Sequence, residues 1–142
     1  MTAVVRTLGA VDLLDYTKYR TPDAAHNIQH HYSQSAYAHR GGGFAHTFTR
    51  SAGDTIALHI ICVANGSEQN AEDAKQAVLD QIDLAQQHNN ELVAPVYYTY
   101  QFGDMTTSHI YQILTCEDVT ENLPPGVGDI ELVLNLKGNQ IQ

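Results

Sequence analysis

The pattern of apolar and polar positions is clearest from residue 44 onward. Residues 55–63 (TIALHIICV) form a β-branched run that is apolar at nearly every position, which predicts a buried central strand. In residues 130–137, Ile and Leu alternate with mostly polar residues, which predicts a strand with one buried face. Between these strands, apolar residues at spacings of three and four predict one amphipathic helix of about 17 residues that is capped by Asn70. Its buried stripe is Ala74, Val78, Ile82 and Ala85.

Three further strands are predicted around these elements. Residues 44–50 read as a short strand, residues 96–102 place Tyr98, Tyr100 and Phe102 on one face, and residues 109–117 follow after a turn at Gly103. We expect a loop over residues 118–128, which is rich in Pro and Gly. The resulting order β-β-α-β-β-β predicts an α+β fold, an antiparallel β-sandwich or barrel with one covering α-helix.

The first 43 residues have a different character. They are rich in His, Tyr, Ser, Ala and Gly and show only weak periodicity. We interpret residues 12–43 as an extended arm or long loop with at most one helical turn, and Gly41–Gly43 as a flexible joint. The sequence therefore predicts an N-terminal segment and extended arm over residues 1–43, followed by a domain over residues 44–142.

Composition narrows the classes of function. The chain has 142 residues, which fits one domain, and 7 basic against 16 acidic residues give a formal net charge of −9. The basic residues are scattered, which argues against binding of nucleic acid or of an anionic membrane. We see neither a signal peptide nor a stretch of about 20 apolar residues. The charged fraction of 16% lies below the usual value of about 25%, so a neutral polar surface suited to subunit association is expected.

Histidine is frequent, with eight residues, and His26, His30 and His31 have a spacing that would place two imidazoles on one helix face. A metal-binding module is therefore one hypothesis, although hydrogen-bonding histidines in a polar arm are the more ordinary interpretation. Cys62 and Cys116 both lie in apolar runs. We favour two buried thiols over a disulfide between them.

A pocket lined by tyrosine and histidine is another hypothesis. Tyr98 and Tyr100 could face His109 and Tyr111 on the neighbouring strand, as in a small-molecule-binding protein or an enzyme on an α+β barrel. No nucleophile elbow or phosphate-binding loop is present, and the paired carboxylates fall on a solvated helix face or in a loop. We therefore assign no catalytic, cofactor-binding or metal-binding residue, and we expect a non-enzymatic protein without a cofactor.

The order of elements from residue 44 to residue 138 resembles small tail and baseplate proteins of phages. The resemblance is chiefly to the tail-protein-U type of contractile phages, and more widely to the tail-tube-like group that includes distal tail proteins. It is carried by HTFT (residues 46–49), GDTIAL (53–58), FGD (102–104), the apolar strand at 110–115 and IELVLNLK (130–137). The His-rich residues 12–43 lie outside it.

This resemblance implies a structural subunit of a tail, tube or baseplate. Such subunits form rings, commonly of six copies, around a lumen through which DNA passes, and they contact other tail or baseplate proteins. It also implies a place in the virion, after assembly in the host cytoplasm, and no catalytic residues. An acidic chain is compatible with such a lumen because it repels phosphates.

Overall fold

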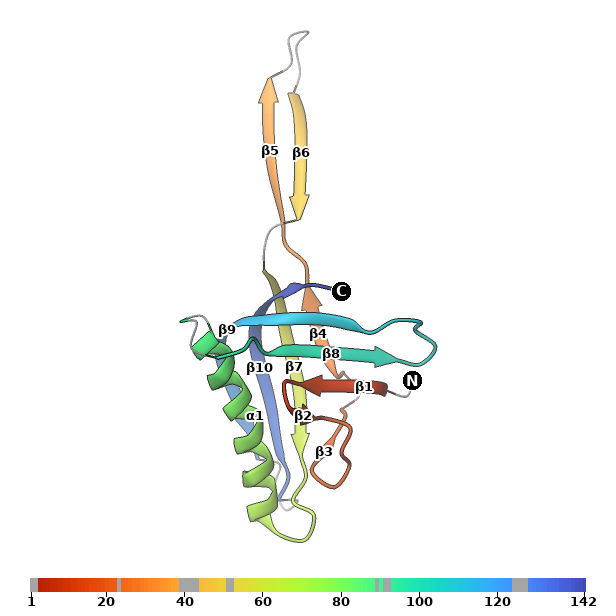
Figure 1. Cartoon of the computed structure of the whole chain (residues 1–142), viewed down its shortest axis with the longest axis vertical. Coiled ribbons are helices and arrows are strands. Elements are labelled where there is room, and N and C mark those ends of the chain that lie inside the picture. The colour runs from red at the N-terminus through yellow and green to blue at the C-terminus, as the bar shows by residue number, and fades with distance from the viewer. Residues whose placement is uncertain are drawn as a thin grey trace.

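The computed structural model describes residues 3–22, 24–38, 44–50, 53–88, 90, 93–123 and 128–142. Most of its strands belong to one eight-stranded antiparallel sheet, which is covered by a single described helix (Figure 1). The helix is α1 (Glu68–His88). The strands are β1 (Ala3–Leu8), β2 (Val11–Asp12), β3 (Tyr19–Arg20), β4 (His26–Gln29), β5 (Tyr32–Ala38), β6 (Phe44–Arg50), β7 (Asp54–Cys62), β8 (Tyr97–Phe102), β9 (His109–Asn122) and β10 (Ile130–Gln140).

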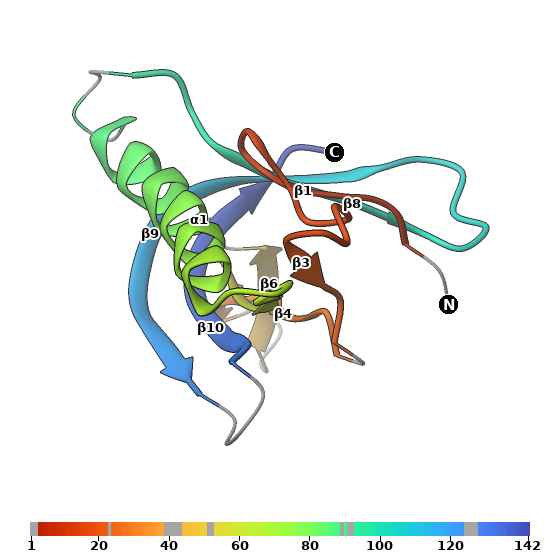
Figure 2. The ribbon, with the colours of Figure 1, turned by 90° about the horizontal axis from the view of Figure 1, so that it is seen from below.

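The strand order in the large sheet is β2-β1-β8-β9-β10-β7-β3, and β4 also pairs with β7. The register between β10 and β9 shifts twice, and such irregularities bend a strand and increase its twist. Figure 2 shows that the sheet curls, with α1 on its inner side. The predicted α+β class with one covering helix agrees with this structure, whose sheet has the form of a half-barrel.

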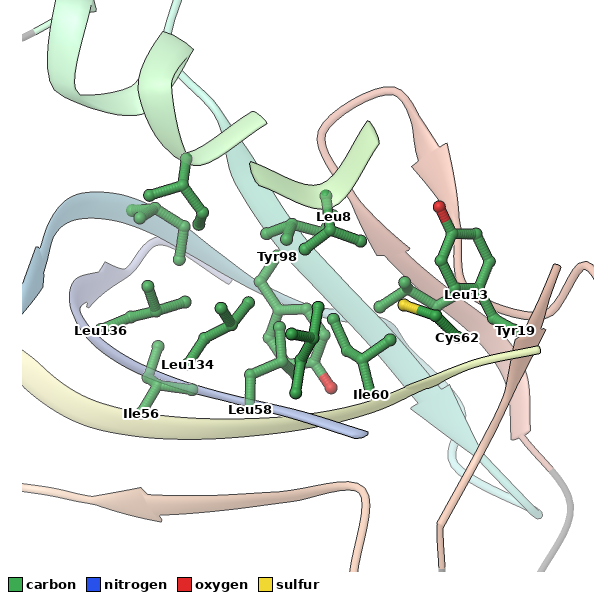
Figure 3. Close-up of a cluster of buried hydrophobic side chains, with 14 of the residues drawn as sticks. Leu8, Leu13, Tyr19, Ile56, Leu58, Ile60, Cys62, Tyr98, Leu134 and Leu136 are labelled. Carbon is green, nitrogen blue, oxygen red and sulfur yellow. The ribbon is translucent and has the colours of Figure 1, made fainter. Parts of the chain in front are cut away.

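The hydrophobic core lies between α1 and the inner face of the sheet (Figure 3). Side chains alternate between buried and half-buried along the whole of β7, and nearly so along β10, as the sequence pattern predicts. The predicted helix stripe is also confirmed, since Ala74, Val78, Ile82 and Ala85 are all buried. The Tyr19 hydroxyl fixes the helix to β3 by donating to the Ala74 carbonyl over 2.9 Å.

The helix begins three residues earlier than predicted. Ser67 occupies the capping position, and its hydroxyl accepts the backbone N–H of Gln69 at 3.2 Å. Asn70 is therefore inside the helix, and its side-chain amide donates to the Asn65 carbonyl at 3.1 Å. The prediction that Asn70 caps the helix is wrong because the turn at Gly66, with a φ of 88°, already directs the chain into the helix at Ser67.

The described part of residues 12–43, which we interpreted as an extended arm or long loop, contains strands. The short strands β3 and β4 both pair with β7, and β1 pairs with β8. Strands before residue 43 therefore pair with strands after it in the same sheet. Strands of two to four residues are too short to show a periodic signal. They form because the long neighbouring strand β7 holds them in place.

The predicted strand at residues 44–50 is present, but it belongs to a separate hairpin. β6 pairs only with β5, in a register that places Tyr32 opposite Arg50 and Ala38 opposite Phe44. Figure 1 shows this hairpin extending well beyond the helix and the large sheet. The predicted joint at residues 41–43 lies outside the described residues.

The strand β9 is longer than predicted. It continues to Asn122, so the expected loop at residue 118 is wrong over its first five residues. The Pro- and Gly-containing residues 124–127 lie outside the described part of the chain. Within that part, no helix has the length and apolar character needed to span a membrane.

Candidate functional site

Six aromatic rings gather on the inner face of the sheet, and we call them the aromatic cluster. Its members are His26 from β4, Tyr98, Tyr100 and Phe102 from β8, and His109 and Tyr111 from β9. The Tyr100 ring is central. Its centroid lies 4.4 Å from that of His26, 5.3 Å from that of His109 and 5.4 Å from that of Phe102. Alternation along β8 places its three rings side by side, as the sequence predicts.

The four residues of the predicted pocket, Tyr98, Tyr100, His109 and Tyr111, are brought together. Their rings contact one another, however, and Tyr98 and Tyr111 are buried. His26 fills the space over Tyr100, and no sequence signal pointed to this histidine as their partner. The arrangement therefore resembles aromatic packing at the end of a core more than the lining of a binding site.

A cleft of about 520 Å³ lies elsewhere, between the C-terminal half of α1 and the start of β8. Its wall includes Gln81, Leu84, Val96 and Tyr97, and none of the four residues predicted to line a pocket. The side-chain oxygen of Gln81 accepts the backbone N–H of Ala10 at 3.2 Å. This cleft is thus bounded by the contact between the helix and the β1–β2 turn.

The histidines of the metal hypothesis have separate partners. Nδ1 of His26 lies 2.8 Å from the Tyr98 hydroxyl, and Nδ1 of His30 lies 2.8 Å from a carboxylate oxygen of Asp54. Nε2 of His31 lies 2.7 Å from the Thr55 hydroxyl. The helix assumed for the H-x3-H-H spacing is absent, because His26 begins the strand β4. In the described ranges no group of three potential ligands could hold a metal ion.

Both cysteines are free thiols. Cys62 is buried in the core, and burial raises its pKa to about 12. Cys116 is half-buried on β9, and burial raises its pKa as well. A thiol with a raised pKa is a poor nucleophile at neutral pH, so neither cysteine resembles an activated catalytic residue.

Arg6 is the polar residue that the sequence did not single out. It is on β1 and fully buried. Its Nη2 donates to the Ala25 carbonyl at 2.8 Å and also to the His59 carbonyl, so it links β1 to β7 and to the residue that precedes β4. In the sheet order three strands separate β1 from β7. Arg6 therefore ties together the two sides of the curled sheet.

The His26–Tyr98 contact crosses the sheet in the same way, from β4 to β8. Burial, with smaller contributions from Arg6 and His59, lowers the pKa of His26 to about 4. Burial also raises the pKa of Tyr98 to about 12. At neutral pH both groups are uncharged, and they form one neutral hydrogen bond between β4 and β8.

We expect His26 to make the protein sensitive to acid. Its pKa is lower in the folded protein than the ordinary 6.5, so the unfolded chain binds the proton more tightly. The stabilisation is complete above pH 6.5 and decreases as the pH falls toward 4. Because His26 is only partly buried, the free energy of unfolding should fall by about 1–2 kcal/mol more for the wild type than for His26→Gln between pH 7 and pH 4.5. Urea titrations of both proteins across this range measure the difference, and parallel curves would contradict the prediction.

Comparison with known proteins gives a likeness of fold only. No protein-family profile matches the chain, and no curated protein is similar to it in sequence. Among solved structures, it is similar to the Dit (gp 19.1) protein of phage SPP1, described as a paradigm of the hub adsorption apparatus in phages that infect Gram-positive bacteria. The TM-score is 0.55 at 13% identity, over 94% of this chain and 49% of that one. The chain thus spans about half the length of a phage protein, and the likeness does not point to the tail-protein-U type in particular.

Proposed function

We propose that this protein is a non-enzymatic structural subunit of a phage-type tail or baseplate. The observation that carries the proposal is the fold, because 94% of the chain superimposes on a protein described as part of a phage hub and adsorption apparatus. Fold alone does not determine function, so the chemistry of the chain has to agree with the assignment. In the described residues, the polar groups brought together inside the half-barrel link strands and pack against one another, as in a structural protein.

In this proposal, copies of the chain form a ring, with six as the expected number, around a lumen through which DNA passes. The net charge of −9 supports this role, because an acidic wall repels phosphates and lets DNA move without being held. The low charged fraction of 16% leaves neutral polar surface for contacts between copies. The partners are further copies and other tail or baseplate proteins, and the place of action is the virion, after assembly in the host cytoplasm.

The oligomeric state tests the proposal directly. We expect the purified full chain to form a closed ring, seen as one discrete mass by native mass spectrometry and as an annulus by negative-stain microscopy. Mixing with tail or baseplate proteins from the same genome should recruit the chain to their complexes. A protein that stays monomeric at about 100 μM and binds none of these partners would overturn the proposal, because μM affinity is weak for a virion contact.

A further inference from the structure

The strand β9 has one edge that no described strand covers over its last residues. β8 pairs with β9 only from His109 to Gln112, whereas β10 continues alongside β9 as far as Asn122. From Glu117 to Asn122 every side chain is exposed, on both faces of the strand. An exposed edge of this length offers backbone N–H and C=O groups to another strand.

The β5–β6 hairpin also has strand edges that no other described strand covers. Among the described strands, these two pair only with each other, and Figure 1 shows that the hairpin stands apart from the large sheet. A two-stranded hairpin alone is marginally stable in water, and a third strand stabilises it. The hairpin also points away from the body, so its natural partner is a strand of another molecule.

The charges of these two segments are complementary. From Ala24 to Gly53 the chain has no Asp or Glu, although it has 16 acidic residues in all, and this stretch contains Arg40 and Arg50. The free part of β9 carries Glu117, Asp118 and Glu121. Neither hairpin strand contains an acidic residue, and β6 ends in Arg50, so the hairpin is attracted to the acidic β9 edge.

The alternative interpretation is that acids on β9 only prevent unwanted pairing. Two of them are partly neutralised within the molecule, because Lys137 lies 3.4 Å from Glu117 and Lys75 lies 3.2 Å from Glu121. Two β9 edges would still repel each other, since each also carries Asp118. This repulsion disfavours pairing of β9 with β9 of another copy, but it does not act against the acid-free hairpin.

We propose that the β5–β6 hairpin of one copy adds as a strand to the β9 edge, Glu117–Asn122, of the next copy. The inference rests on the proposed function, since it names the contact between neighbouring copies of the ring. Backbone hydrogen bonds would supply the affinity, and the opposite charges would select this pairing. Different surfaces meet in such a contact, so it is head-to-tail and closes into a ring when the rotation between copies allows.

The test uses two charge-reversed variants of the full chain. The edge variant is Asp118→Arg with Glu121→Arg, and the hairpin variant is Arg40→Glu with Arg50→Glu. The matched control, Asp80→Arg with Asp83→Arg, makes the same charge change as the edge variant on exposed positions of α1. We expect the edge and hairpin variants each to assemble at least about ten-fold more weakly than the wild type by mass photometry. The control should assemble like the wild type, and thermal melts check that all three fold.

An equimolar mixture of the edge and hairpin variants should assemble again, because every contact between unlike copies then joins opposite charges. Hydrogen exchange should also slow at the amides of residues 117–122 on assembly of the wild type. If both variants and the wild type assemble equally, the proposed contact is overturned while the structural role stands. A wild type that neither self-assembles nor joins tail proteins would overturn the role itself.

Discussion

Leu134→Ala is expected to lower the free energy of unfolding by about 2–5 kcal/mol. Leu134 is fully buried in the middle of β10, directly opposite Leu58 on β7, which is also fully buried. Figure 3 shows both side chains in the centre of the core. Truncation removes apolar contacts and leaves a cavity that the paired strands on either side cannot close. Urea denaturation followed by far-UV circular dichroism measures the loss.

Leu123→Ala is the matched control, because it removes the same atoms from a side chain that is 66% exposed. We expect its free energy of unfolding to stay within about 0.5 kcal/mol of the wild type. Equal losses in the two variants would mean that β10 does not form the centre of the core.

Arg6→Met is expected to lower the free energy of unfolding by about 1–3 kcal/mol. The substitution keeps an apolar chain of similar length but removes the Arg6 donor from the His59 carbonyl, while the Ala25 carbonyl still accepts the backbone N–H of His59 at 3.0 Å. A buried acceptor that loses its partner costs about 1–3 kcal/mol. The gain from no longer burying a charge offsets part of this cost. Thermal and urea unfolding of the variant measure the balance.

Arg20→Met provides the contrast, since the Arg20 side chain is 60% exposed and its nearest carboxylate oxygen, on Asp129, lies 3.4 Å away. Asp129 is buried, but the Arg20 guanidinium is open to water, so we expect the pair to contribute about 1 kcal/mol. If Arg6→Met proves as stable as the wild type, the guanidinium does not hold the two sides of the sheet together.

The elements that could be predicted from sequence are those whose own residues carry the pattern. The central strand, the helix stripe and the last strand each bury one periodic set of side chains, so periodicity identifies them without knowledge of their neighbours. The strands β3 and β4 were missed because they are too short to show a period and are held in place by β7. Residues 12–43 therefore read as an arm or long loop although the described strands β3, β4 and β5 lie there.

The polar contacts inside the half-barrel could not be predicted for a related reason. Alternation placed Tyr98 and Tyr100 on one face, but their contact with His26 depends on β4, which the sequence did not show. Arg6 looks like a surface residue between Val5 and Thr7, and only the curl of the sheet brings the Ala25 and His59 carbonyls to it. Contacts between strands distant in sequence leave no local pattern.

The pairing of β1 with β8 has a consequence for how the chain folds as it is made. Leu8 leaves the ribosome ahead of Tyr98, which lies opposite it in the sheet and is synthesised 90 residues later. At roughly 5–20 residues per second, β1 waits about 5–20 s without its partner. Contacts this distant in sequence slow folding, because a long loop must close before they form. β1 thus cannot pair in the sheet until β8 has been synthesised, about 90 residues after Leu8.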